Sequence, residues 1–210
     1  MRYQLLSAAA IIAATLTSCG GGASTDENPV ADSTAVMSYT IDPAASKLDW
    51  AGTMVGIKTH RGTLNFLNGT FTTLGGKLTS GDFTVDMKNY TMNDTNYAKE
   101  GSEQGTKAHL MRHLMSGEFF AVDSFPTATL KITGVTGNTA TADLTVRGKT
   151  NSETITDIVI TPNPKDSTVT ATASLNFDRQ KYGVSWSSGS KDYVLNDIIE
   201  LKVELSGKAR

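Results

Sequence analysis

The chain has 210 residues and a net charge of −2 from 19 basic and 21 acidic side chains, so it is long enough to bury a sizeable core. Its 39% hydrophobic fraction and low net charge are typical of a folded domain and exclude a disordered acidic tail. No basic excess exists to neutralise phosphates, so we expect no nucleic-acid partner. The 30 threonines and 19 glycines favour strands joined by tight turns.

Residues 1–18 have the pattern of an export signal. Arg2 precedes an apolar run over residues 5–16, which is shorter than the roughly 20 residues that a membrane-spanning helix needs. The tetrapeptide LTSC at the end of this run resembles the bacterial lipobox, in which a peptidase cuts before a cysteine that then carries diacylglycerol. We therefore expect residues 1–18 to be a lipoprotein signal peptide and Cys19 to be lipidated. An ordinary signal peptide with an incidental cysteine is the alternative.

Cys19 is the only cysteine, which excludes an intramolecular disulfide. Residues 20–38 are small and polar without periodicity, so residues 19–38 are predicted to be the lipidated cysteine and a flexible tether. Acyl chains on Cys19 would hold an exported protein to a membrane of the cell envelope, on its periplasmic or surface face. Arg2 and three acidic residues of the tether account for the charge imbalance. The domain over residues 39–210 is therefore neutral, with no strong field to steer a charged partner.

From Tyr39 onward, apolar residues mostly alternate with polar ones, as in antiparallel strands that have one buried face. The alternation is clearest over residues 78–87, 128–132, 140–146, 169–177 and 199–205. Turn signals separate the runs at Asn68-Gly69, Gly75-Gly76, Gly137-Asn138, Arg147-Gly148 and residues 162–164. About eight strands at this spacing predict an all-β domain, either a sandwich or a closed barrel.

A short helix is predicted over residues 106–115, where Leu110 and Leu114 are four residues apart and Gly117 follows as a terminator. A helix in an otherwise all-β domain usually covers one end of the sheet structure.

His109 and His113 share one face of this helix. A catalytic zinc motif would need a glutamate directly after the first histidine, where Leu110 stands. The alternatives are a two-histidine metal site, with His60 or Glu118 as third ligand, and a surface pair of histidines, which the sequence favours.

Motifs of nucleophilic catalysis and of phosphate binding are missing from the sequence, so we predict no catalytic residues, no cofactor and no resident metal. Asp178-Arg179 is expected to be a structural ion pair at a strand end.

The aromatic and methionine residues exceed what a simple two-layer core needs. In a closed barrel they either fill the interior or line a cavity for one apolar ligand. We predict an elongated cavity, open at one end, with a polar group at its mouth. The alternation selects as its lining Trp50, Phe66, Phe83, Met87, Leu114, Phe119, Phe177 and Trp186, with His113 or Arg179 at the mouth.

Five sequence elements, in order, resemble the YceI-like family of bacterial polyisoprenoid-binding lipid carriers. They are Tyr39-Thr40-Ile41-Asp42 with Trp50 and His60-Arg61-Gly62, His113-Leu114 with Phe119-Phe120 and Phe125-Pro126, residues 144–150 (LTVRGKT), Phe177-Asp178-Arg179 with Tyr182-Gly183, and residues 197–201 (DIIEL). The resemblance covers nearly all of residues 39–207.

This resemblance implies an extended antiparallel β-barrel, similar to lipocalins, with a helix beside it. It also implies an activity, which is to hold a long isoprenoid tail inside the barrel, and relatives suggest a homodimer. The expected function is therefore that of a membrane-anchored lipoprotein which binds an isoprenoid or another long-chain lipid for sequestration or transport. One alternative is a structural or stress-linked envelope lipoprotein with a filled barrel. Another is an enzyme that acts on a lipid, with His113 as general base.

Replacement of Cys19 by alanine should release the protein from the membrane fraction, because the acyl chains would have no sulfur to attach to. Fractionation of cells that express the wild-type or the C19A chain measures this. Equal retention of both chains in the membrane fraction would contradict the lipoprotein assignment.

Overall fold

The computed structural model describes residues 34–189, 191 and 194–210. The predicted signal peptide, Cys19 and most of the predicted tether lie outside these described residues. The first strand begins at Val36, so residues 36–38, which the sequence assigned to the tether, belong to the sheet.

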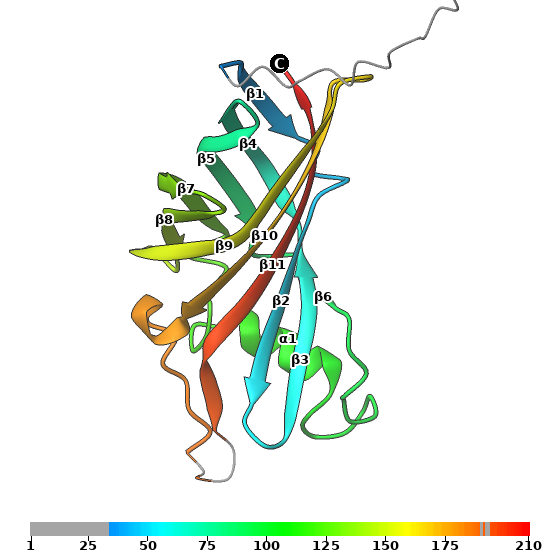
Figure 1. The fold of residues 1–210 in the computed structure, drawn as a ribbon. Coiled ribbons are helices and arrows are strands. Elements are labelled where there is room, and N and C mark those ends of the chain that lie inside the picture. The colour runs from blue at the N-terminus through cyan, green and yellow to red at the C-terminus, as the bar shows by residue number, and fades with distance from the viewer. Residues whose placement is uncertain (1–33, 190, 192–193) are drawn as a thin grey trace, which may run out of the picture. The chain divides into compact units, whose positions relative to one another are not determined.

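Eleven strands, one α-helix and one 3-10 helix form over the described residues (Figure 1). The strands are β1 (Val36–Ile41), β2 (Lys47–Met54), β3 (Lys58–Leu64), β4 (Phe66–Leu74), β5 (Lys77–Asp86), β6 (Thr91–Met92), β7 (Thr127–Thr136), β8 (Thr139–Val146), β9 (Lys149–Asn163), β10 (Thr168–Asp178) and β11 (Leu195–Ala209). The helices are α1 (Lys107–Met115) and η1 (Arg179–Tyr182).

The strands form a closed antiparallel barrel, as the sequence predicted, and not a sandwich. Neighbouring strands follow the order β1-β4-β5-β7-β8-β9-β10-β11, and β11 pairs again with β1 to close the ring of eight. β2 follows β1 along the same edge of β11, and β3 pairs with β2 and leads directly into β4. These two strands extend the barrel at one end. The predicted alternation is confirmed in β8, where Ala140, Ala142, Leu144 and Val146 are buried. Their side chains therefore face the barrel interior.

Closure depends on β11, which has 15 residues. One of its edges pairs with β10, and the other edge pairs first with β2 and then with β1. Residues 195–204 pair with β2, and residues 207–209 pair with β1. Between them the chain of residues 42–46 leaves the ladder, where the N–H of Asp42 donates to the carbonyl of Ser206 at 2.7 Å and the Ser46 side chain takes the place of a backbone acceptor for the N–H of Ser206. The Ser46 Oγ accepts from the N–H of Ser206 at 3.0 Å and donates to the carbonyl of Ser206 at 3.2 Å. The ladder of hydrogen bonds is thus continuous across this gap.

Gly207 of β11 pairs with Ile41 of β1, where the ring closes. A Cβ atom at this position would lie 2.5 Å from the carbonyl oxygen of Thr40 and 3.1 Å from the Cα of Ile41. Both neighbours are backbone atoms in the paired strand, so they cannot rotate away. Closure of the ring therefore requires glycine here.

The barrel wall is incomplete between β3 and β5. The last pair between β4 and β5 joins Phe66 to Val85, and the edge of β3 pairs only with the two residues of β6. The connection over residues 87–126 covers this end, and Figure 1 shows its helix α1 in the half of the barrel that holds the β2–β3 turn.

Helix α1 confirms the predicted span almost to the residue. The hydroxyl of Thr106 caps its N-terminus and accepts from the N–H of His109 at 3.1 Å. At the other end the N–H of Ser116 donates to the carbonyl of His113. Leu114 is buried against the barrel, so the helix is held mainly by its apolar face.

Asn68-Gly69, predicted to be a turn, lies inside β4. A Cβ atom at Gly69 would lie 2.5 Å from Phe83 and 2.9 Å from Ile41. The glycine makes room for side chains of two neighbouring strands and does not reverse the chain, so the turn prediction is wrong.

Gly207→Ala should lower the free energy of unfolding by about 1–3 kcal/mol, because the methyl group would push β1 away from β11. Gly52→Ala is the matched control, since its Cβ would meet only Ile199 Cδ1 at an ordinary 3.7 Å. Chemical denaturation of both variants measures the difference. Equal stability of the two would show that closure tolerates a side chain at position 207.

Candidate functional site

The interior of the barrel is not filled. A cavity of about 600 Å³ runs through it, within the range of roughly 300–1,000 Å³ that is usual for small-molecule sites. Its wall is almost entirely hydrocarbon and aromatic. β11 contributes residues from Leu195 to Leu205, which is about 33 Å of extended strand. The cavity is therefore long as well as apolar, and the structure does not show the filled barrel that was the sequence's main alternative.

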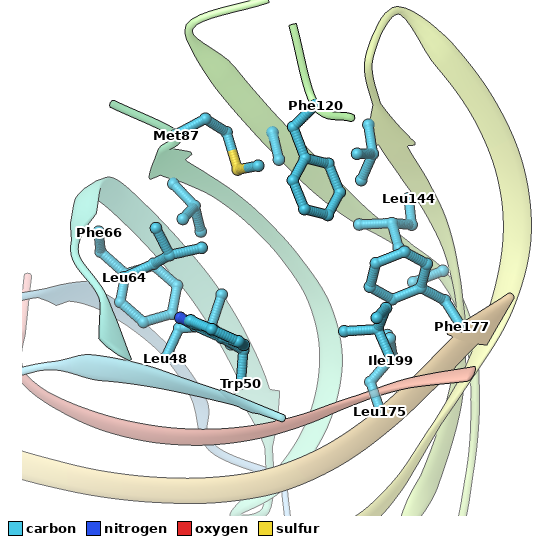
Figure 2. Packing of buried hydrophobic residues seen from close by; sticks show 14 of the residues in the cluster. Leu48, Trp50, Leu64, Phe66, Met87, Phe120, Leu144, Leu175, Phe177 and Ile199 are labelled. Carbon is cyan, nitrogen blue, oxygen red and sulfur yellow. The ribbon is translucent and has the colours of Figure 1, made fainter. Parts of the chain in front are cut away.

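The structure places nine of the ten predicted ligand-binding residues on the cavity wall. These are Trp50, Phe66, Phe83, Met87, His113, Leu114, Phe119, Phe177 and Trp186. Figure 2 shows Met87 and Phe120 approaching the interior from one side, and Trp50 and Phe177 from others. Alternation assigned the inward face correctly for the four of these nine residues that lie on strands, Trp50, Phe66, Phe83 and Phe177.

Trp50 lies across Gly62 on the neighbouring strand. A Cβ atom on Gly62 would lie 2.7 Å from Cε2 and Cζ2 of the indole. The ring also meets Tyr90 edge to face, with ring centroids 6.1 Å apart. Because Gly62 has no side chain, the indole packs against its backbone. Trp50 is therefore part of the cavity wall and does not fill the cavity.

Small side chains of β10 also line the cavity, and the sequence analysis did not select them. Ala171 and Ala173 are half-buried and face the open space. The same period-two pattern contains them. Their small size could have identified them, because an inward side chain that is too short to fill the barrel leaves volume for a ligand.

Arg179 does not lie on the cavity wall, which corrects the prediction that it meets a ligand at the mouth. Its guanidinium is buried and donates to the carbonyls of Val184, Trp186, Leu195 and Asn196 at 2.6–3.4 Å. Its carboxylate partner is Asp197, at 2.9 Å. These contacts join the segment after η1 to the start of β11.

The expected pair of Asp178 with Arg179 is likewise corrected. The Asp178 carboxylate accepts from the N–H of Gln180 at 2.8 Å, so it caps η1. Arg179 remains structural, as the sequence suggested, but through other partners. It acts on the cavity indirectly, because Trp186 and Leu195, whose carbonyls it holds, both line the wall.

His113 enters the wall from α1 and contacts aromatic rings. Its ring centroid lies 4.8 Å from that of Trp186 and 5.3 Å from that of Phe119. Nδ1 is 3.9 Å from the exposed carboxylate of Glu118, and buried Nε2 has no hydrogen-bond partner among the described residues. Burial lowers the pKa of His113 below its ordinary value, and Glu118 opposes that shift only in part. His113 is therefore a neutral, mostly apolar wall residue near pH 7.

His60 of β3 and His109 of α1 also line the cavity, although neither was among the predicted binding residues. His60 belongs to a polar cluster. Its Nδ1 lies 3.2 Å from the carboxylate of Asp94, and its ring stacks on Tyr97 with centroids 4.9 Å apart. No local pattern could show this cluster, because Asp94 and Tyr97 belong to the connection after β5.

Metal binding finds no support in the described part of the chain, where no three His, Cys, Asp or Glu residues lie close enough to hold an ion. His109 and His113 therefore lack a third ligand among those residues. Over the same residues, no helix has the length and hydrophobicity to cross a bilayer.

Comparison with known proteins identifies the domain. The model of the YceI-like domain matches residues 39–207. A segment of 82 residues is 37% identical to a UPF0312 protein of Staphylococcus aureus strain N315 and 34% identical to one of strain USA300. Each match covers 36% of this chain and 46% of the relative, so the chain spans about half the length of the curated relatives it matches.

Two solved structures resemble this chain at low sequence identity, and the first of them shares the fold. BcnA of Burkholderia cenocepacia has a TM-score of 0.53 at 17% identity, over 79% of this chain and 98% of that chain. A polyisoprenoid binding domain from Saccharophagus degradans has a TM-score of 0.48 at 12% identity, over 82% of this chain and 98% of that chain.

Arg179→Ala should lower the free energy of unfolding by about 3 kcal/mol, because four carbonyls and a carboxylate lose a charged donor. Asp197→Asn, the control, should cost less than about 1 kcal/mol, since Asp197 is half-exposed and the carbonyl contacts remain. Urea denaturation of both variants measures these costs. A D197N loss as large as that of R179A would assign the stabilisation to the ion pair instead.

Proposed function

The chain belongs to the YceI-like family, and on that premise we propose that its barrel binds one long apolar lipid, an isoprenoid such as a polyprenyl chain or a quinone, for sequestration or transport. The observation that carries this proposal is the long hydrocarbon-walled cavity. A prenyl chain is uncharged along its length, and so is the wall that it would contact.

The deep part of the cavity favours an apolar tail over a compact polar ligand. The wall residues there, which include Phe71, Leu78, Ile132, Ile160 and Leu205, carry no titratable side chain. Each methylene that enters such a wall gains about 0.8 kcal/mol of transfer free energy. Part of this gain offsets the lost freedom of the chain, so affinity grows with tail length more slowly than the buried area suggests.

The proposal is for a binding role and not for catalysis. Two of the three wall histidines are held by neighbours that define their positions, His113 by aromatic rings and His60 by Asp94 and Tyr97. We further propose that the protein is exported and anchored through acylated Cys19. An anchored carrier would stay beside the membrane in which a long isoprenoid is dissolved.

Ala173→Phe should reduce the amount of lipid that co-purifies with the protein at least about tenfold, because the ring would occupy the cavity where a tail must pass. Ala173 already faces open space, so the added ring should cost little in folding stability. Solvent extraction and native mass spectrometry of the purified protein measure the bound lipid.

Thr170→Phe is the matched control, since Thr170 lies on the same strand, is exposed and does not line the cavity. This variant should keep the wild-type lipid content. A wild-type protein that carries no lipid and binds no added prenyl chain would overturn the proposed function.

A further inference from the structure

The charged residues and the histidines of the cavity wall gather at the end formed by β3 and α1, whereas Thr129, Thr172 and Ser174 line it elsewhere. The polar residues at this end include Lys58 and His60 on β3, Gln104 before α1, and His109 and Glu118 in and after α1. Lys58 lies beside the β2–β3 turn, and Gln104 and Glu118 are exposed, so solvent reaches this end. An amphiphilic ligand that inserts its tail into the hydrocarbon part would keep its head group here.

Asp94 orients His60 within this polar end. Its carboxylate accepts hydrogen bonds from the N–H of Arg61 at 2.8 Å, the N–H of Asn96 at 3.1 Å and the hydroxyl of Tyr97 at 2.8 Å. Burial alone would raise the pKa of Asp94, but these donors and His60 hold the pKa below its ordinary value. The carboxylate is therefore ionised and can only accept, so Nδ1 of His60 must carry the proton that it donates.

Nε2 is the remaining polar atom of the imidazole. Tyr97 covers one ring face at an interplanar angle of 14°, and Nε2 has no hydrogen-bond partner among the described residues. Burial and nearby Lys58 lower the pKa of His60 below its ordinary value, although Asp94 opposes them. The ring is thus neutral near pH 7, with its proton on Nδ1 and a lone pair on Nε2.

We propose that Nε2 of His60 is the head-group acceptor of the lipid site and selects apolar chains that end in a hydroxyl group, whether an alcohol or a phenol. A chain that ends in an ether offers only an oxygen lone pair, which Nε2 repels. This inference rests on the proposed lipid-binding function and adds its head-group specificity. Asp94 is a positioning residue, because it acts only through the tautomer of His60.

Two probes with the same tail test the inference, geranylgeraniol and its methyl ether, with affinities measured by quenching of tryptophan fluorescence. The wild-type protein should bind the alcohol about fivefold more tightly than the ether, the value of one ordinary hydrogen bond. In His60→Phe, which keeps a ring to stack on Tyr97, the two affinities should agree within about twofold. Thr59→Val is the control and should keep the preference, because Thr59 bonds to Thr53 and does not line the cavity.

Asp94→Asn tests whether Asp94 sets the tautomer of His60 or has only a structural role. The amide would donate to Nδ1 and move the ring proton to Nε2, so the ether should gain affinity while the alcohol changes little. A structural role for Asp94 would instead weaken both probes equally, and this outcome would overturn the positioning role.

Failure of this inference differs from failure of the proposed function. If wild-type protein binds both probes equally, or if H60F keeps the preference, the head-group site is wrong while lipid binding stands. If wild-type protein binds neither probe, the lipid-binding function itself is wrong.

Discussion

The pairing of β11 with both β1 and β2 is the interaction on which the rest of the structure depends. The ring of eight strands that this pairing closes satisfies its backbone hydrogen bonds around the circumference, and the extension formed by β2 and β3 keeps an edge, at β3. The ring therefore holds its shape without a solid core of side chains. Ser46 and Gly207 make closure possible. The Ser46 hydroxyl bonds to the backbone of β11 between its β2 and β1 pairings, and Gly207 leaves room for the backbone of β1. The enclosed space is a consequence of this backbone arrangement.

The interior is packed unevenly along its length. Near α1, aromatic rings contact one another in pairs, such as Tyr90 with Phe120 at 6.4 Å and Phe119 with Phe120 at 5.0 Å between centroids. Farther along, alanines and aliphatic side chains of β9–β11 leave volume between the walls. A bound tail would fill that volume and bury wall that is otherwise open. A ligand that bound this cavity would therefore stabilise the folded barrel.

Two polar clusters fix the positions of wall residues at the open end of the barrel. Arg179 holds four backbone carbonyls and so positions Trp186 and Leu195 on the wall. The Asp94 carboxylate accepts hydrogen bonds from β3 and from its own loop, and its bond with Nδ1 orients the His60 ring. In each cluster a charged group is surrounded by fixed partners, which makes its desolvation tolerable. One cluster supports the wall, and the other holds a histidine of the wall in a fixed orientation.

Features that depend on near neighbours in the chain could be predicted from the amino-acid sequence. Alternation placed the inward faces, and the apolar spacing around Leu114 gave the helix almost to the residue, because both periods are local properties of the backbone. Tertiary structure decided what depends on distant residues. Gly69 proved to be a packing glycine because of Ile41 and Phe83, and Arg179 took Asp197 as its carboxylate partner. The open interior and the pairing of His60 with Asp94 arise only when the ring closes, since closure fixes how much volume the inward side chains must share.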